Sequence, residues 1–176
     1  MEVLNYTEFR NNLAENLIPT GHFNYPLKQE GERFPLNAPQ ARGFEETGLS
    51  HEGRFTANME GVAFIERLAF ELIEELSGEK VAKVFTAGGA SNSEVWLRIR
   101  ANVLNKPLYK MKNVSGAVGA AISAASKTYF NTLTEAVKAL TVIEKEILPK
   151  KELTALYQIQ YIRFVDILKE KGFFNT

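Results

Sequence analysis

The stretch from Val81 to Ala125 constrains the fold of this chain more than any other part of the sequence. It begins with a short β-branched run over 81–86, passes through the turn Ala87-Gly88-Gly89-Ala90, and ends in a run of Gly, Ala and Ser. This order predicts a buried strand, a glycine turn, a helix, a short strand over 108–111 and a small-residue helix over 115–129. It places backbone N–H groups and a helix start at the carboxyl end of a strand, where α/β proteins commonly hold nucleotides.

The composition limits the class of protein and its partners. The chain has 176 residues, of which 45% are hydrophobic, so a domain with a sizeable core is expected. Lys and Arg number 21 and Asp and Glu number 21, which gives no electrostatic reason to expect nucleic acid or a membrane as partner. The absence of cysteine excludes disulfides and thiolate chemistry. Because no signal peptide or membrane-spanning apolar run is visible, we expect a cytoplasmic protein.

We expect a single domain over residues 1–176, in three parts. Residues 1–20 form a lead-in segment with a weak helical pattern over 6–17. Residues 21–57 are rich in Pro, Gly and charge but also in aromatic residues, which predicts an ordered, irregular segment rather than a disordered linker. Residues 58–172 form the α/β core.

Four helices are expected in this core besides the small-residue helix. The clearest spans 58–76 with a broad apolar stripe, and Ser77-Gly78 ends it. The helix after the glycine turn has Ser91 or Asn92 as its cap. Its residues divide into an inward set and an outward set: Val95, Trp96, Ile99 and Val103 inward, and Arg98 and Arg100 outward. A short helix over 134–140 is capped by Thr134, and a long one begins after Pro149 and runs to about Lys171. The packed face of the long helix includes Leu153, Leu156, Tyr157, Gln160 and Phe164.

The turn Ala87-Gly88-Gly89-Ala90 is the strongest candidate for a binding site. Glycine lets a phosphate or nucleoside approach the backbone, and the following helix offers free N–H donors and the positive end of its dipole. A tight turn without a ligand is the alternative, and the glycine spacing matches neither the Walker P-loop nor the Rossmann fingerprint. The run Gly116–Ala121 allows a second close approach to a nucleotide, but we favour helix packing through small residues.

Other polar residues give no catalytic pattern. His22 and His51 have no partner at metal-ligand spacing, and the serines at 91, 93 and 115 lie in no nucleophile elbow. Glu30 and Glu32 are expected to be solvated. Trp96, Tyr157 and Tyr161 are expected to be core anchors.

Taken together, these segments resemble the C-terminal domain of the FGGY family of carbohydrate kinases over about residues 21–172. The resembling pieces occur in family order: Tyr25-Pro26-Leu27, Gly31-Glu32-Arg33-Phe34-Pro35, Ala41-Arg42-Gly43-Phe44, His51 through Asn58-Met59-Glu60-Gly61 to Phe64, Thr86 through Trp96, Asn105-Lys106-Pro107, Gly116–Ala121 and the helix with Tyr157 and Tyr161. The chain departs from the family at three positions: Ala87 replaces a common glycine, and Arg98 and Asn102 stand where many members have Gln and Asp.

The resemblance implies an actin-like, ribonuclease H-like ATPase fold, with a central sheet, packed helices and a cleft between two domains. It implies that Gly88, Gly89 and Ala90 contact ATP through their backbone. Asn92 or Ser93 would be the polar neighbour near the ribose or adenine. Mg²⁺ is implied as well, although no residue here is identifiable as its ligand.

The parent reaction of the family transfers the γ-phosphate of ATP to a sugar or polyol hydroxyl. The sugar site and the catalytic aspartate of the family belong to an N-terminal domain that this chain does not contain, so we expect the chain alone to be inactive. Two alternatives remain open: a stand-alone nucleotide-binding module, and a structural module that complements a separate N-terminal half. Self-association through an exposed interdomain face is a further hypothesis.

Overall fold

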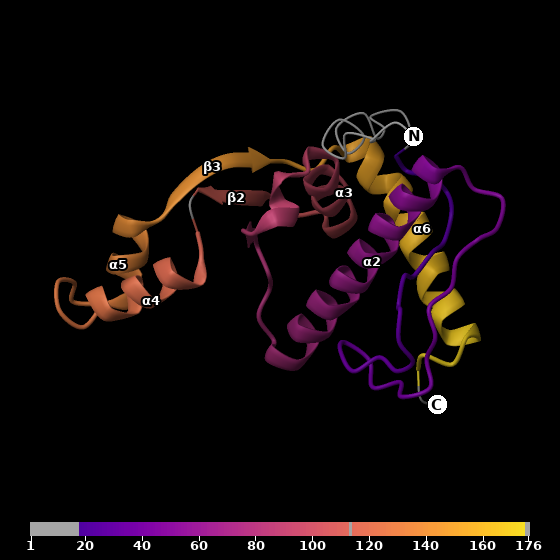
Figure 1. Ribbon diagram of the computed structural model, residues 1–176, viewed down its shortest axis with the longest axis horizontal. Coiled ribbons are helices and arrows are strands. Elements are labelled where there is room, and N and C mark those ends of the chain that lie inside the picture. Colours follow the sequence, from indigo (N-terminus) through magenta and orange to yellow (C-terminus); the bar gives the residue numbers. More distant parts are fainter. Residues whose placement is uncertain (1–17, 113, 175–176) are drawn as a thin grey trace, which may run out of the picture.

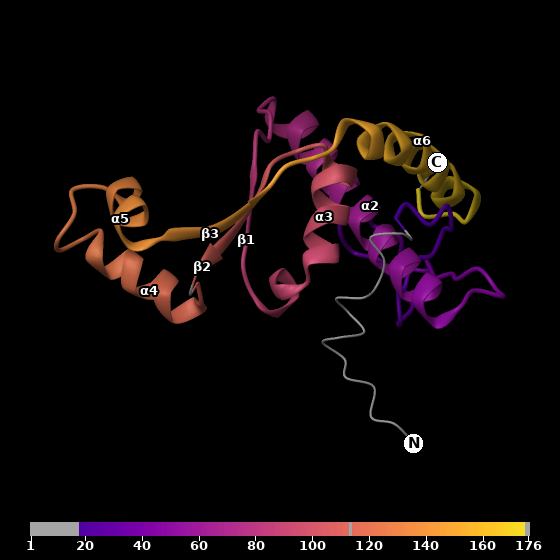
Figure 2. The same cartoon turned by 90° about the horizontal axis from the view of Figure 1, so that it is seen from above.

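The computed structural model describes residues 18–112 and 114–174 (Figures 1 and 2). The expected helical pattern over 6–17 lies outside these residues. The described part is an α/β structure whose elements occur in this order: α2 (His51–Ser77), β1 (Val84–Thr86), the short 3₁₀ helix η1 (Gly89–Asn92), α3 (Glu94–Leu104), β2 (Leu108–Lys112), α4 (Gly116–Ala125), α5 (Leu133–Leu140), β3 (Val142–Ile147) and α6 (Lys151–Glu170).

The longest helix, α2, begins earlier than the predicted residue 58. Ser50 caps it, since the Ser50 Oγ accepts a hydrogen bond from the Gly53 N–H at 3.0 Å. Its first turns bury Thr56 and Ala57, so packing supports a stretch whose own helical propensity is modest. The predicted end is confirmed, because Gly78 adopts a left-handed conformation with φ of 73°.

The irregular segment before α2 is ordered, as its aromatic residues predicted. Tyr25 and Phe44 form an isolated antiparallel bridge, and both rings contact Phe173 from the end of the chain. The segment lies unusually close to α2 at Gly61, where a side-chain Cβ would meet the Asn24 carbonyl oxygen at 1.8 Å. Glycine at this position therefore permits the contact between the segment and the helix.

The sheet has three strands in the order β1-β2-β3. β1 and β2 are parallel and are joined through α3, whereas β2 and β3 are antiparallel. The predicted buried strand over 81–86 is only partly correct, because it is shortened to Val84–Thr86 and its Phe85 side chain is exposed. β3 was not predicted, since five of its six residues are exposed and its sequence shows no alternation toward a core.

Two apolar clusters meet at α3. One lies between α2, α3 and α6, where Phe64 contacts Phe164 with ring centroids 5.1 Å apart and Tyr157 is fully buried. The other packs the sheet on α3 through six buried residues: Val84, Leu97, Ala101, Leu104, Leu108 and Ile147. The predicted inward positions Val95, Ile99 and Val103 are confirmed, so α3 is the element that joins the sheet to the helical layer.

A buried carboxylate links three parts of this core. Glu60 of α2 is fully buried and accepts hydrogen bonds from the Thr20 N–H at 3.1 Å, from the Thr20 hydroxyl, and from the Tyr157 hydroxyl at 2.7 Å. Burial raises the pKa of Glu60, although these donors oppose that shift. Glu60 therefore connects the irregular segment, α2 and α6 at one point.

Several predicted helix limits in the second half are wrong by a few residues. Thr132 rather than Thr134 caps α5, because the Thr132 Oγ1 accepts from the Glu135 N–H at 3.1 Å. The small-residue helix ends at Ala125 instead of Tyr129. On α6, Leu156 is exposed instead of packed, whereas Tyr157 and Tyr161 are buried as expected. Figures 1 and 2 show α4 and α5 at the far end of the β2–β3 hairpin, away from α2 and α6.

Candidate functional site

The glycine turn follows β1 and requires glycine at its second position. Gly88 has φ of 91° and ψ of 178°, a conformation that side-chain-bearing residues rarely adopt. Ser91 holds the turn closed, since its hydroxyl donates to the Gly88 carbonyl at 2.6 Å and its N–H donates to the same oxygen at 3.1 Å. Gly88, Gly89 and Ala90 are exposed, so the backbone of the turn is accessible to a ligand.

The cap of the helix after the turn is Ser93, which corrects the prediction of Ser91 or Asn92. The Ser93 Oγ accepts from the Trp96 N–H at 3.4 Å, and α3 begins at the next residue. The correction arises because residues 89–92 form a separate 3₁₀ helix, which shifts the α-helical start. Asn92 is exposed and Ser93 is buried.

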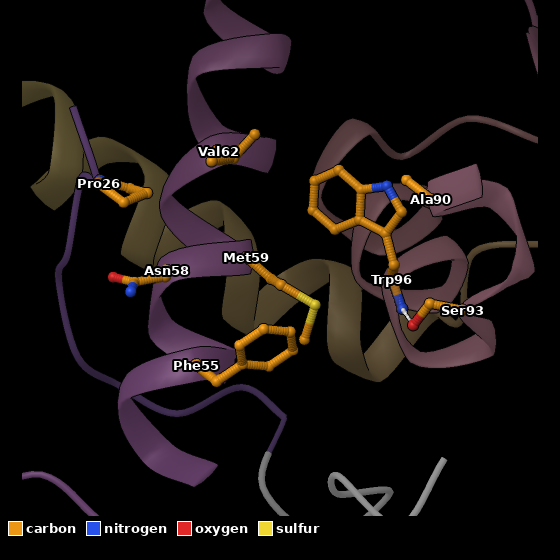
Figure 3. Close-up of a pocket in the computed structure, with 8 residues that line it drawn as sticks. All are labelled: Pro26, Phe55, Asn58, Met59, Val62, Ala90, Ser93 and Trp96. Atoms are coloured by element: carbon orange, nitrogen blue, oxygen red, sulfur yellow. Dashed lines mark hydrogen bonds between the residues drawn. The ribbon is translucent and has the colours of Figure 1, made fainter. Parts of the chain in front are cut away.

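A pocket of about 420 Å³ lies beside this turn, between α2 and the start of α3. Figure 3 shows its eight lining residues: Pro26, Phe55, Asn58, Met59, Val62, Ala90, Ser93 and Trp96. Of the five predicted site residues, Ala90 and Ser93 line the pocket, while Gly88, Gly89 and Asn92 do not. The sequence therefore predicted only residues of the turn and the helix start, and it did not predict that residues of α2 line the pocket.

The pocket is apolar, with few hydrogen-bonding groups. Phe55, Met59 and Trp96 face it, and such a lining suits a flat ring better than a charged group. Asn58 is the one lining residue with an amide side chain. Its Nδ2 donates to Glu45 at 3.2 Å, and its Oδ1 is buried without a hydrogen-bond partner. An unsatisfied acceptor of this kind is uncommon in proteins. A regular apolar spacing that extended α2 toward residue 55 was the signal that could have located this wall.

Arg100 connects the pocket to the glycine turn, although it was predicted to point outward. Its guanidinium donates to both oxygens of Glu66, at 2.7 Å and 2.5 Å, and to the Thr86 hydroxyl at 2.8 Å. It also lies 5.5 Å from the centre of the Trp96 ring. Thr86 ends β1 just before the turn. The Arg100 side chain therefore links α2, α3, the segment before the turn and the Trp96 wall of the pocket.

Arg98 and Asn102, which depart from the residues common in the family, do not lie at the pocket. The Asn102 Oδ1 accepts from the Lys150 N–H at 2.7 Å, and its Nδ2 donates to the Arg98 carbonyl at 2.7 Å. Asn102 thus supports the start of α6. Neither residue 98 nor residue 102 lines the pocket.

The remaining candidates are not brought to the pocket. Gly116 and Gly119 lie on α4, and a Cβ at either position would meet no protein atom within 4 Å, so the close helix packing expected at these glycines is not found in the described structure. His22 pairs with Glu46 at 2.8 Å. Glu30 pairs with the exposed Arg42, whereas Glu32, expected to be solvated, accepts a hydrogen bond from the Tyr25 hydroxyl.

Two negative findings concern the described residues 18–112 and 114–174. Within them, no three His, Asp or Glu side chains converge as a metal site would require. In the same residues, no helix is both long and apolar enough to cross a bilayer.

Comparison with known proteins places this geometry in a family. Residues 5–128 match the model of the FGGY family of carbohydrate kinases, C-terminal domain. The chain is 27% identical to a xylulose kinase of Staphylococcus epidermidis over 94% of its own length, and 28% identical to a xylulose kinase of Bacillus subtilis over 83%. It spans only 34% and 30% of those relatives, about a third of each.

Solved structures agree with this assignment. A xylulose kinase from Rhodospirillum rubrum superposes with a TM-score of 0.70 at 26% identity, covering 85% of this chain and 30% of that one. A Plasmodium falciparum glycerol kinase with ADP superposes at 0.68 with 17% identity, over 94% of this chain and 33% of that one, a likeness of fold alone. The fold is that of the actin-like ATPases, as expected from the sequence.

Proposed function

Because the chain belongs to the FGGY family of carbohydrate kinases, we propose that it forms the ATP-binding part of an enzyme that phosphorylates a sugar or polyol hydroxyl. In this proposal the chain acts as one domain, and the apolar pocket receives the adenine ring of ATP. A cytoplasmic location belongs to the same proposal.

The observation that carries this proposal is the position of the pocket against the glycine turn. Ala90 and Ser93 belong both to the turn region and to the pocket wall, so a base in the pocket would bring its ribose and phosphates toward Gly88 and Gly89. The aromatic lining offers stacking to a base. Asn92, exposed beside the turn, would be the polar neighbour of the ribose.

Within residues 18–112 and 114–174, no group of carboxylates fits a Mg²⁺ site, and we derive no step through that ion. Aspartate occurs once in the sequence, at Asp166, and there it pairs with Lys169 at 3.3 Å on the surface of α6. A kinase needs a base for the acceptor hydroxyl and charge neutralisation around the transferred phosphoryl group. We therefore propose that the chain binds nucleotide but transfers phosphate only together with the rest of an FGGY kinase.

The same observation supports the alternative of a nucleotide-binding module without catalytic activity. A coupled kinase assay separates the two. Activity of the chain alone on any pentulose, hexulose or polyol would refute the proposed dependence on further protein. Activity that appears only after fusion to the remaining part of a related kinase would support it.

Nucleotide binding can be measured directly, because Trp96 is the single tryptophan of the chain and lines the pocket. Titration with ATP or ADP should change Trp96 fluorescence in a saturable way. Ala90→Phe, which fills the pocket, should abolish the change, whereas Ala139→Phe on the exposed surface of α5 should preserve it. If calorimetry and fluorescence both detect no binding at millimolar ATP, the pocket is not an adenine site.

A further inference from the structure

One face of α3 carries three side chains that lie at or beside the candidate site. Ser93, Trp96 and Arg100 are spaced by three and four residues, so they share this face of the helix. Ser93 and Trp96 line the pocket, whereas Arg100 does not. The Arg100 Cζ lies 5.5 Å from the centre of the Trp96 ring. Arg100 therefore contacts the pocket wall without being part of the pocket lining.

The guanidinium of Arg100 is engaged by protein groups on all three of its nitrogens. Nε and Nη2 donate to the two carboxylate oxygens of Glu66, at 2.7 Å and 2.5 Å, and Nη1 donates to the Thr86 hydroxyl at 2.8 Å. Arg100 is also buried, with 8% of its surface exposed. Paired bonds of this kind hold the planar guanidinium in one orientation. This geometry supports a role in orienting other parts of the site, not a direct contact with a phosphate.

The bond to Glu66 sets the position of α3 relative to α2 beside the pocket. Met59 and Val62 line the pocket from α2, and Glu66 is the next residue along the same face of that helix. Figure 3 shows Met59 and Val62 across the pocket from Trp96. The pair of Glu66 and Arg100 therefore joins the two walls one helical turn beyond the lining residues. Because its two bonds are directional, the pair fixes the separation of the walls more closely than apolar contacts do.

The bond to Thr86 anchors the start of the glycine turn. Thr86 is the last residue of β1, and Gly88 adopts its left-handed conformation two residues later. The hydrogen bonds from Ser91 to the Gly88 carbonyl are internal to the turn. At the other end of the turn, Ser93 caps α3. The turn is thus attached to α3 at both ends, through Arg100 at its start and through Ser93 at its finish.

We propose that Arg100 is a positioning residue of the nucleotide site, which orients the Trp96 wall and holds the glycine turn in place before a ligand binds. The identity of the ligand rests on the proposed function, whereas the effects on Trp96 and on the turn follow from the geometry. A site that is ordered in advance loses less conformational freedom when its ligand binds. Weakening the contacts of Arg100 should therefore lower the affinity for nucleotide.

A purely stabilising role for Arg100 is the alternative, since loss of a buried ion pair also destabilises a fold. The Thr86 hydroxyl separates the two roles. Thr86→Val removes the bond to Arg100 and keeps a β-branched side chain, which suits a strand. Thr86→Ser keeps the hydroxyl but loses the branching methyl group. A positioning role therefore predicts that the valine variant binds nucleotide more weakly, whereas a stabilising role predicts no such preference.

Titration with ATP, followed by Trp96 fluorescence and by calorimetry, gives the dissociation constant of each variant at a temperature where all are folded. Thr86→Val should raise the dissociation constant by about fivefold to tenfold. Thr86→Ser should stay within about twofold of the wild type. Asn102→Ala is the control for stability, because it weakens contacts of α3 away from the pocket and should also stay within about twofold.

Two measurements on the chain without nucleotide test the positioning directly. In Thr86→Val the backbone amides of residues 88–92 should exchange with solvent at least about fivefold faster than in the wild type, while Thr86→Ser and Asn102→Ala keep the wild-type rates. Arg100→Lys keeps the charge but loses the planar fork. In that variant, acrylamide should quench the fluorescence of Trp96 more strongly, and the affinity for ATP should fall as in Thr86→Val.

Wild-type exchange in Thr86→Val together with wild-type quenching in Arg100→Lys would overturn the proposal. So would dissociation constants of these two variants within about twofold of a wild type that binds ATP. An affinity that follows stability, with Asn102→Ala as weak as Thr86→Val, would assign Arg100 a purely stabilising role. If the wild type binds no ATP while exchange and quenching change as expected, the positioning by Arg100 stands and the proposed function fails.

Discussion

Replacing Arg100 by alanine should destabilise the fold and alter the environment of the pocket. The Arg100 side chain is 10% exposed and that of Glu66 is 24% exposed, so this ion pair is largely shielded from water. The substitution would leave the Glu66 carboxylate without its two hydrogen bonds, and it would also remove the bond to the Thr86 hydroxyl.

The expected magnitude follows from this burial. Removing one partner of a fully buried pair costs about 3–5 kcal/mol. Because about a quarter of the Glu66 side chain still reaches water, we expect about 2 kcal/mol from the unpaired carboxylate. The lost bond to Thr86 adds about 1 kcal/mol, so the total is about 3 kcal/mol.

Urea unfolding followed by far-UV circular dichroism gives the free energy of unfolding of the variant. Arg163→Ala is the matched control, because its pair with Glu170 is exposed on both sides and should contribute less than about 0.5 kcal/mol. In a double-mutant cycle, Glu66→Ala and Arg100→Ala should couple by about 2 kcal/mol. Trp96 emission should also shift in the folded Arg100→Ala variant, since the guanidinium lies 5.5 Å from the ring.

Two results would refute this reasoning. One is a loss of less than about 0.5 kcal/mol for Arg100→Ala, which would mean that the pair contributes no more than an exposed one. The other is additivity of the two single variants, which would mean that Arg100 and Glu66 do not interact in solution.

Three further predictions concern stability. Gly61→Ala should destabilise the fold by more than about 2 kcal/mol, because the new Cβ would meet the Asn24 oxygen at 1.8 Å. Gly119→Ala has open space around it and should stabilise the fold by about 0.5–1 kcal/mol. The urea midpoints of the two variants test this, and equal effects would contradict it. Since burial raises the pKa of Glu60, the folded chain holds this proton more tightly than the unfolded chain, so the contribution of Glu60 to stability falls as pH rises above about 4.5. Glu60→Gln should remove that contribution, so its stability relative to the wild type should increase as pH rises; a difference that does not vary with pH would be inconsistent with the raised pKa. Asn102→Ala removes the acceptor for the amide at the start of α6 and should cost about 1–2 kcal/mol, with faster hydrogen exchange in the first turn of that helix; unchanged exchange would show that Asn102 does not support the helix start.

Local patterns in the sequence were sufficient for the elements that bury a regular apolar face. The stripe along 58–76 predicted α2, and the order of strand, glycine turn and helix predicted the site region with Gly88 in a glycine-requiring conformation. β3 shows the limit of this reasoning. Its residues are nearly all exposed, and only pairing with β2 reveals it as a strand.

The candidate site was predictable only in part, because its walls come from distant segments. Ala90 and Ser93 lie at the turn that the sequence indicates, but Phe55, Met59 and Val62 reach the pocket from α2. A turn shows its own backbone requirements in its residues. It does not show which helix will lie opposite.

The sequence by itself determined the family, the α/β class and the location of the glycine turn, since these depend on local spacing and on motifs in a fixed order. Only the tertiary structure decided that Arg100 is buried, because its partner Glu66 is 34 residues away on another helix. It alone also separated the covered face of the sheet from the open one. The physical reason is the same in both cases. Burial and pairing depend on which elements meet in space, and a local sequence pattern contains only one of the two partners of a long-range contact.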